Sequence, residues 1–351
     1  MEPKKVLIGM SGGVDSSVAV KRMLEAGYAC TGCNLLLACA DASDDARLAA
    51  ERFGIPFLVM DMQDTFRRQV QDRFAAVYEA GETPNPCIDC NRELKFGAML
   101  DRALELGFDA VATGHYAQIR FDPESGRYLL YKAADQAKDQ TYFLYCLTQH
   151  QLAHTLFPLG DLTKDQVRAI AEEAGLLNAR KRDSQDICFI PGGDYLDFLQ
   201  RYRGMAYEPG DYLDLEGTVI GRHKGAVAYT IGQRKGLGIA LGTPAYVCAK
   251  DMERNTVTLG PNEALFTEEL TADELNWIPF PTLTKPMELT SKIRHSQTEQ
   301  ECTVYPQGDR VRVVFRHPQR AVTPGQAVVF YKGDLVIGGG RIRSAGGPDT
   351  I

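Results

Sequence analysis

The stretch that decides the fold of this chain lies near its start and reads Gly9-Met10-Ser11-Gly12-Gly13-Val14-Asp15-Ser16-Ser17. It follows the apolar run Val6-Leu7-Ile8, which predicts a buried parallel strand, and it leads into apolar residues three or four apart, which predict an amphipathic helix. The two adjacent glycines carry no Cβ atoms, so backbone N–H groups can approach an anion closely, and the helix N-terminus adds its positive dipole end. The stretch therefore predicts a phosphate-binding loop.

This loop differs from the two common nucleotide-binding motifs. It has no lysine of the Walker A kind, G-x-x-x-x-G-K-[ST], and it does not match G-x-G-x-x-G. Ser11, Ser16 and Ser17 add hydroxyl donors instead. The pattern S-G-G-x-D-S resembles the pyrophosphate loop (PP-loop) of ATP pyrophosphatases, and the resemblance implies that Asp15 is the carboxylate for a magnesium ion.

The composition is that of a globular enzyme of more than one domain. The chain has 351 residues, of which 44% are apolar and 24% are charged. No apolar run approaches the length of a membrane span and no leader is recognised, so we expect a cytoplasmic protein without membrane contact. The net charge of −7 does not indicate nucleic-acid binding. Any contact with RNA would therefore come from local basic patches.

Strand and helix patterns alternate through the first 115 residues, which predicts an α/β, doubly wound parallel sheet with ligands at the carboxyl ends of its strands. Gly9 and Gly114 both lie at such ends. A hairpin is expected at 118–121 and 128–131, and short strands with glycine-rich turns follow from Pro209. We expect a catalytic domain over 1–205, a small β-rich domain over 206–265 and a β-barrel over 266–351. Helices are expected over the ranges 65–80, 92–106, 139–147, 163–174 and 195–202.

The nine cysteines indicate thiol or metal chemistry, because their number is odd and no disulfide scaffold is apparent. Cys87 and Cys90 form a C-x-x-C just before the helix expected at 92–106, where a helix N-terminus would depress a thiol pKa. Cys188 lies in a polar, cation-flanked segment that suits a thiolate. The others are expected to be core or structural residues: Cys30, Cys33, Cys39, Cys146, Cys248 and Cys302.

Seven motifs together resemble the bacterial tRNA-uridine 2-sulfurtransferase (tRNA 2-thiouridylase) family over about residues 6–340. The motifs are Gly9–Ser17, Thr83-Pro84-Asn85-Pro86, Ala112-Thr113-Gly114-His115-Tyr116-Ala117, Lys138-Asp139-Gln140-Thr141-Tyr142-Phe143-Leu144, Asp186-Ile187-Cys188-Phe189-Ile190, Gly232-Gln233-Arg234-Lys235-Gly236-Leu237-Gly238 and Thr323-Pro324-Gly325-Gln326. The resemblance implies that the enzyme adenylates the wobble uridine of a tRNA and then replaces its C2 oxygen by sulfur.

The same resemblance implies a role for each matching residue. ATP would bind to the loop Gly9–Ser16 (Gly9, Met10, Ser11, Gly12, Gly13, Val14, Asp15 and Ser16), with Leu35 and Gly114 around the adenine. Cys90 would be the nucleophile, and Cys188 would carry a persulfide and pair transiently with Cys90. The target base would contact Asn85, Pro86 and Cys87, and the tRNA would contact His115, Lys138, Asp139, Gln140, Arg294, His295 and Gln326. A protein persulfide donor, or sulfide, would supply the sulfur.

Cys87 departs from the pattern of many family members, which carry an aspartate at this position. Asp89 is offset by two positions, so that role does not transfer to it. The departure opens an alternative in which Cys87, Cys90 and Cys188 ligate a four-iron cluster that binds sulfide.

Other interpretations remain open at this stage. An ATP-dependent ligase or amidotransferase would share the loop without needing Cys90 or Cys188, and an RNA-binding protein could retain a vestigial nucleotide site. His115 could simply close the ATP site. The basic clusters Arg180-Lys181-Arg182 and Arg234-Lys235 are either phosphate contacts or solvated surface charge.

Overall fold

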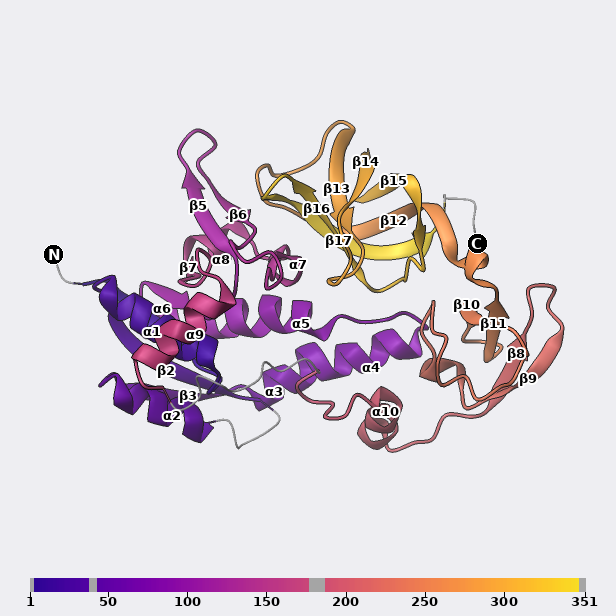
Figure 1. The fold of residues 1–351 in the computed structure, drawn as a ribbon, viewed down its shortest axis with the longest axis horizontal. Helices are drawn as coiled ribbons and strands as arrows, with labels where there is room; N and C mark the ends of the chain where they lie inside the picture. Colours follow the sequence, from indigo (N-terminus) through magenta and orange to yellow (C-terminus); the bar gives the residue numbers. More distant parts are fainter. Residues whose placement is uncertain (1–2, 38–42, 177–186, 347–351) are drawn as a thin grey trace.

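The computed structural model describes residues 3–37, 43–176 and 187–346. The parallel sheet lies at one end of the molecule, a small sheet lies at the other, and a β-barrel packs between them above a run of helices (Figure 1). Cys39 and the cluster Arg180–Arg182 fall outside the described residues. Within the described ranges, no helix is long and apolar enough to cross a membrane.

The N-terminal sheet has five parallel strands in the order β3-β2-β1-β4-β7. They are β1 (Lys5–Gly9), β2 (Ala29–Leu36), β3 (Phe57–Asp61), β4 (Ala110–Ala112) and β7 (Thr155–Leu156). The predicted run Val6-Leu7-Ile8 is fully buried in β1. The strand order reverses between β1 and β4, and the crevice at such a switch point is where doubly wound sheets bind ligands. The predicted fold class is confirmed; β7 was not foreseen, because two residues carry no periodicity.

Helices cover this sheet and extend away from it. They are α1 (Val14–Glu25), α2 (Ser43–Arg52), α3 (Gln63–Phe66), α4 (Asp72–Glu79), α5 (Pro86–Asp89), α6 (Met99–Glu105), α7 (Thr141–Leu144), α8 (Gln149–Ala153), α9 (Lys164–Glu173) and α10 (Tyr195–Arg203). Two wider π-helical segments, η2 (Arg67–Gln71) and η3 (Cys90–Ala98), join α3 to α4 and α5 to α6. The Thr163–Gln166 capping box of α9 is present with both of its hydrogen bonds.

Two predicted helices differ from the structure. The helix expected over 92–106 begins at Pro86, because proline is favoured at the first helical position and Asn85 before it is non-helical. The C-x-x-C therefore lies inside the helix rather than before it. The helix expected over 139–147 is limited to Thr141–Leu144.

The second half of the chain is built from antiparallel and mixed β-sheet. A four-stranded sheet has the order β10-β11-β8-β9, and a six-stranded barrel, β12-β15-β14-β13-β16-β17, is closed by pairing of β12 with β17. These strands are β8 (Gly210–Leu213), β9 (Val219–His223), β10 (Tyr246–Asp251), β11 (Thr256–Gly260), β12 (Phe266–Trp277), β13 (Met287–Lys292), β14 (Gln300–Gln307), β15 (Arg310–Arg320), β16 (Ala327–Lys332) and β17 (Leu335–Ala345). Short 3₁₀ turns lie at η4 (Ala226–Ala228) and η5 (Asn262–Leu265).

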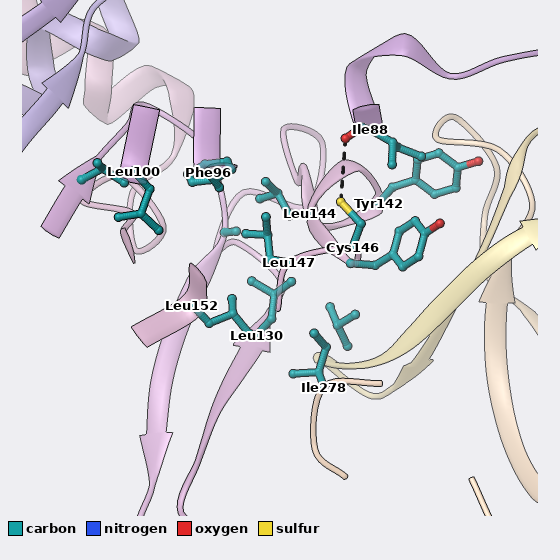
Figure 2. Close-up of a cluster of buried hydrophobic side chains, with 14 of the residues drawn as sticks. Ile88, Phe96, Leu100, Leu130, Tyr142, Leu144, Cys146, Leu147, Leu152 and Ile278 are labelled. Atoms are coloured by element: carbon teal, nitrogen blue, oxygen red, sulfur yellow. Dashed lines mark hydrogen bonds between the residues drawn. The ribbon is translucent and has the colours of Figure 1, made fainter. Parts of the chain in front are cut away.

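The barrel and the N-terminal domain share one hydrophobic core. The predicted hairpin, β5 (Gln118–Asp122) and β6 (Arg127–Tyr131), is confirmed, and its second strand pairs with β17 of the barrel. Figure 2 shows Ile278, which follows the barrel strand β12, packed near Leu130 and Leu147 of the N-terminal domain. The hydroxyl of Tyr142 donates a hydrogen bond of 2.9 Å to the carbonyl of Ala327 in β16. The barrel is thus held against the catalytic domain by apolar burial rather than by a flexible linker.

Candidate active site

The glycine-rich loop connects β1 to α1 and lines a cavity. Gly12 has a φ of +72°, a conformation that favours glycine. The Ser16 hydroxyl donates a bond of 2.9 Å to the Gly13 carbonyl and accepts one of 3.3 Å from the Ser11 amide. These bonds brace the loop at the N-terminus of α1, where free N–H groups favour an anion.

Gly114, after β4, allows the two strand ends to meet. A Cβ atom at this position would lie 2.7 Å from the backbone carbon of Asp15 and 2.9 Å from the amide nitrogen of Ser16. Such contacts are too short for any side chain, so a glycine is required where this loop crosses the start of α1. The two glycines predicted at the carboxyl ends of the sheet therefore lie on one site.

Asp15 is paired with a lysine that is distant in sequence. The Lys164 ammonium, at the first turn of α9, lies 2.8 Å from both carboxylate oxygens of Asp15, and the Tyr116 hydroxyl donates a bond of 2.8 Å to one of them. The loop therefore has a cation beside it after all, delivered from another helix. The same pairing bears on magnesium, because both oxygens of the one carboxylate offered to the metal are already engaged. Asp15 could therefore hold a magnesium ion only where its pair with Lys164 is open, and the magnesium site stays a prediction.

The cavity in front of the loop has a volume of about 440 Å³. Its lining brings together the loop, the ends of β2 and β4, the helical segment η3–α6 and the segment after residue 186: Gly9, Met10, Ser11, Asp15, Ser16, Cys33, Asn34, Leu35, Leu37, Phe66, Lys95, Met99, Thr113, Gly114, His115, Gln140 and Cys188. The lining includes the apolar side chains of Leu35, Phe66 and Met99 as well as polar and charged groups. The size and the mixed lining fit a nucleotide, whose base would pack against the apolar side chains.

Cys188 lines this same cavity, so the loop and one predicted sulfur carrier share a site. Its thiol is reduced and exposed at the cavity surface, yet the surrounding protein limits its contact with water. Burial, with a smaller contribution from the neighbouring thiols of Cys90 and Cys87, raises the pKa of Cys188 to about 11. The expectation that this segment favours a thiolate is therefore wrong for the structure without substrates.

Cys87 and Cys90 lie on the helix that begins at Pro86. Cys87 is exposed in the first turn, whereas Cys90 is buried at the start of η3 among apolar side chains that include Phe74 and Phe189. Burial raises the pKa of both thiols. The expected depression at a helix N-terminus is wrong here, because desolvation of the thiolate outweighs the helix dipole.

The four-iron alternative is not supported by the arrangement of side chains. Cys87, Cys90 and Cys188 influence one another electrostatically, but no three histidine, cysteine or acidic side chains within the described ranges are placed to hold a metal ion together. Asp89, between the two cysteines, points elsewhere: its carboxylate pairs with Arg73 at 3.2 Å and with Arg92 at 3.3 Å. Asp89 is thus committed to an ion-pair network at the face of the barrel, as its offset position in the sequence suggested.

The remaining cysteines are mostly core residues. Cys30, Cys33, Cys146 and Cys302 are buried, and burial raises the pKa of Cys33 and Cys146 to about 12. Cys248 is half-buried.

Two residues expected to contact tRNA line the nucleotide cavity instead. His115 has its Nδ1 atom 2.7 Å from the Thr113 hydroxyl, and burial lowers its pKa well below the usual value, so the ring is neutral. Gln140 accepts a bond of 2.9 Å from the amide of Tyr116. Lys138 is half-buried and lies two residues before Gln140 in the same loop.

Asp139 cannot reach a ligand in this structure, because it is buried. Its oxygens accept hydrogen bonds from the Ala133 amide at 3.0 Å and the Thr141 hydroxyl at 2.6 Å. In this structure Asp139 holds the loop, and its contact with tRNA stays a prediction. His295 packs on Phe143, and its Nε2 atom lies 3.2 Å from the Asp139 carbonyl.

Arg294 and Gln326 line a second cavity of about 680 Å³ between the barrel, the small sheet and α10. The Gln326 amide donates bonds of 3.1 and 3.0 Å to the carbonyls of Thr83 and Pro84, and thereby ties the loop before α5 to the barrel. Asn85 lies at the end of that loop and Pro86 is buried behind it. Arg234 and Lys235 are exposed nearby, in the segment that bounds this cavity.

Seven residues that line the nucleotide cavity were not predicted as site residues: Cys33, Asn34, Leu37, Phe66, Lys95, Met99 and Thr113. Lys95 and Phe66 come from helices far from the loop in sequence, and Asn34 braces the loop through a bond of 2.8 Å from its amide to the Met10 carbonyl. Lys164, behind Asp15, was missed for the same reason. Each has an ordinary local context, so only its place in the fold could reveal it.

A PP-loop on a switch-point crevice, a cysteine thiol in the same cavity and an appended barrel define an ATP-utilising enzyme of the ATP pyrophosphatase class. Family models match in succession: a tRNA methyl transferase HUP domain over residues 4–192, a tRNA methyl transferase PRC-barrel domain over 196–261 and an aminomethyltransferase β-barrel domain over 267–342.

Relatives match over almost the whole chain. A tRNA-specific 2-thiouridylase MnmA of Acetivibrio thermocellus is 49% identical over 98% of this chain and 100% of its own length. One of Moorella thermoacetica is 50% identical over 96% of this chain and 99% of its own. Among solved structures, a complex of a 4-thiouridine synthetase with RNA and bound ATP covers 56% of this chain and 50% of its own, with a TM-score of 0.36 and 16% identity. On the strength of the sequence relatives, the chain belongs to the tRNA-specific 2-thiouridylase family.

Proposed function

We propose that this protein is an ATP-dependent tRNA-uridine 2-sulfurtransferase that converts the wobble uridine of a tRNA to 2-thiouridine. The observation that carries the proposal is that Cys188 and the PP-loop line one cavity. Membership of the thiouridylase family supports the substrate and the reaction, and favours them over a ligase or an amidotransferase. A single-stranded anticodon loop also suits the reaction, because an unstacked base can enter a pocket.

In the first step, the uridine O2 atom attacks the α-phosphorus of ATP and pyrophosphate leaves. The amides of Ser11–Ser16 and the N-terminus of α1 would hold the phosphates, and Leu35 and Phe66 would face the adenine. The step turns a poor leaving group into AMP. Asp15 would keep the loop in place through its pair with Lys164. Magnesium, where it accompanies ATP, would reach Asp15 only after that pair opens.

In the second step, the terminal sulfur of a persulfide on Cys188 attacks C2 of the base, and AMP departs with the electron pair of the C2–O bond. The Cys90 thiolate then attacks the inner sulfur, the Cys188 Sγ atom, which forms a Cys90–Cys188 disulfide and leaves the other sulfur on the base. A dithiol reductant reduces the disulfide to two thiols. A persulfide-carrying protein then transfers its outer, sulfane sulfur to the Cys188 thiolate and leaves as its own thiolate. Because burial raises the pKa of these thiols, substrate binding must first reposition them or bring positive charge near them.

The loop Thr83–Pro86, tied to the barrel by Gln326, would present the base to Cys87 and Cys90, and the cavity lined by Arg294 would receive the tRNA backbone. Both assignments depend on the position of the loop Thr83–Pro86, because Thr83 of that loop also lines the second cavity.

The test is to incubate purified protein with ATP, unmodified tRNA and a persulfide source, and to quantify AMP, pyrophosphate and 2-thiouridine. The wild type should form all three, whereas Cys188→Ser should form pyrophosphate without 2-thiouridine. Cys90→Ser should trap the tRNA on Cys188. Full activity of Cys188→Ser would refute the proposed sulfur route, and bound iron required for activity would replace it by a cluster.

A further inference from the structure

The nucleotide cavity contains a cation without a partner. Lys95 is the single lysine or arginine among the described residues that line the cavity. Its ammonium forms no hydrogen bond or ion pair with any residue of the ranges 3–37, 43–176 and 187–346. The cations around it differ: Lys164 is paired with Asp15, and Arg92 with Asp89 and Glu93. The charge of Lys95 is therefore available to an anion that enters the cavity.

The width of the helix places Lys95 near the C-x-x-C. Cys90 opens the π-helical segment η3 and Lys95 follows it by five residues in the same segment. In a helix with i→i+5 hydrogen bonds, residue i+5 lies about one turn above residue i on the same face. In an α-helix of 3.6 residues per turn, residue i+5 would lie well round the helix. Single π turns are rare and often occur at functional sites.

The electrostatic effect of Lys95 on the thiols also indicates that its ammonium group lies in their neighbourhood. The Lys95 ammonium lowers the pKa of Cys87, Cys90 and Cys188, although burial outweighs it in each case. The Asp89 carboxylate raises the pKa of Cys87 and Cys90. The thiols of Cys87 and Cys90 raise the pKa of Cys188. Because such effects weaken with distance, the ammonium group lies within electrostatic range of all three sulfur atoms, and it lines the PP-loop cavity together with Cys188.

We propose that Lys95 is a catalytic residue of the sulfur-transfer step, whose ammonium binds the phosphate of the adenylated uridine and stabilises the AMP that leaves. This inference rests on the proposed function. When the C2–O bond breaks, its electron pair remains on the phosphate oxygen, while the C2–S bond forms on the side of Cys188. A cation between the loop and the thiols meets the negative charge as it develops.

Among the described residues that line the cavity, Lys95 alone offers an unpaired positive charge for this role. His115 is neutral, and Lys164 is neutralised by Asp15 behind the loop. The hydroxyls and amides of the PP-loop can bind phosphate, but they carry no full charge. Lys95 is thus assigned to the second step, and the loop is assigned to the first.

The test separates the two steps in a single turnover. Enzyme charged with sulfane sulfur is mixed with ATP and excess unmodified tRNA, and pyrophosphate and 2-thiouridine are followed in the same samples. We expect Lys95→Gln to release pyrophosphate within about threefold of the wild-type rate, and to form 2-thiouridine about 100-fold more slowly while adenylated tRNA accumulates. Lys95→Arg keeps the positive charge and should form 2-thiouridine at least about tenfold faster than Lys95→Gln.

Two controls keep the result interpretable. Arg102→Gln removes a charge from the exposed end of the same helical run and should leave both rates unchanged. Circular dichroism and ATP affinity verify folding, and Lys95→Met replaces Lys95→Gln if the latter does not fold. Equal loss of both steps would overturn the inference, because it would indicate ground-state binding of ATP, and so would the absence of any loss. A wild-type enzyme that forms no 2-thiouridine would instead refute the proposed function.

Discussion

Replacing Lys164 by methionine removes the ammonium group that lies 2.8 Å from both carboxylate oxygens of Asp15. The lysine side chain is 6% exposed and the aspartate side chain is 30% exposed. Removing one partner of a fully buried ion pair costs about 3–5 kcal/mol. Water reaches Asp15 in part, and the Tyr116 hydroxyl still donates a hydrogen bond to it. We therefore expect a smaller loss in the free energy of unfolding, of about 2–3 kcal/mol.

The assay must report on the N-terminal domain alone, since a chain with several domains need not unfold in one step. Hydrogen–deuterium exchange of the fully buried β1 residues Val6, Leu7 and Ile8 meets this need. A loss of about 2–3 kcal/mol corresponds to exchange that is roughly 30- to 150-fold faster. The double variant Asp15→Asn with Lys164→Met removes both charges, and should recover at least half of the loss.

A matched control lies on α1 itself. Lys21 pairs with Glu25 at the surface, and Lys21→Met should change the exchange of β1 by less than about 0.5 kcal/mol. Exchange in Lys164→Met that matches the Lys21→Met control would refute the reasoning. Strictly additive single and double variants would do the same, since they would show that Asp15 and Lys164 are not energetically coupled.

Three further outcomes follow from the geometry. Gly114→Ala places a methyl group 2.7 Å from the Asp15 backbone, and the resulting overpacking of about 1–3 kcal/mol should weaken ATP binding by roughly 5- to 100-fold in calorimetry while tRNA binding is retained. Alkylation of Cys188 should accelerate about tenfold per pH unit from pH 7 to 9, because only the thiolate reacts and its pKa is raised to about 11; a plateau near pH 8 would contradict this. Gln326→Ala removes the donor to the carbonyls of Thr83 and Pro84, and should lower 2-thiouridine formation about tenfold without changing ATP affinity; an equal effect on both would argue against a role in presenting the base.

Features with a short-range physical cause could be predicted from the sequence. The apolar run Val6–Ile8 and the glycine pair after it gave β1, the loop and α1, because strand burial and the need for free amides are local properties. The capping box at Thr163 located α9 for the same reason. The start of α5 was misplaced because Pro86 permits either an extended loop or the first turn of a helix, and only its burial against the core chooses the helix.

The thiol environments show where local reasoning failed. A helix N-terminus and nearby cations suggested depressed pKa values at Cys90 and Cys188, but the packing of Phe74 and Phe189 around this region reversed the direction. Desolvation depends on how many atoms from the whole chain surround a group, and no window of sequence contains that number.

The sequence by itself determined the parallel sheet and the phosphate loop, because each depends on residues close together in the chain. The tertiary structure alone decided that Lys164 partners Asp15, that Lys95 faces both the loop and the thiols, and that Gln326 of the barrel holds the loop before α5. These contacts join residues from separate elements. Their energies depend on distance and burial in space, which are fixed only when the sheet, the helices and the barrel pack on one core.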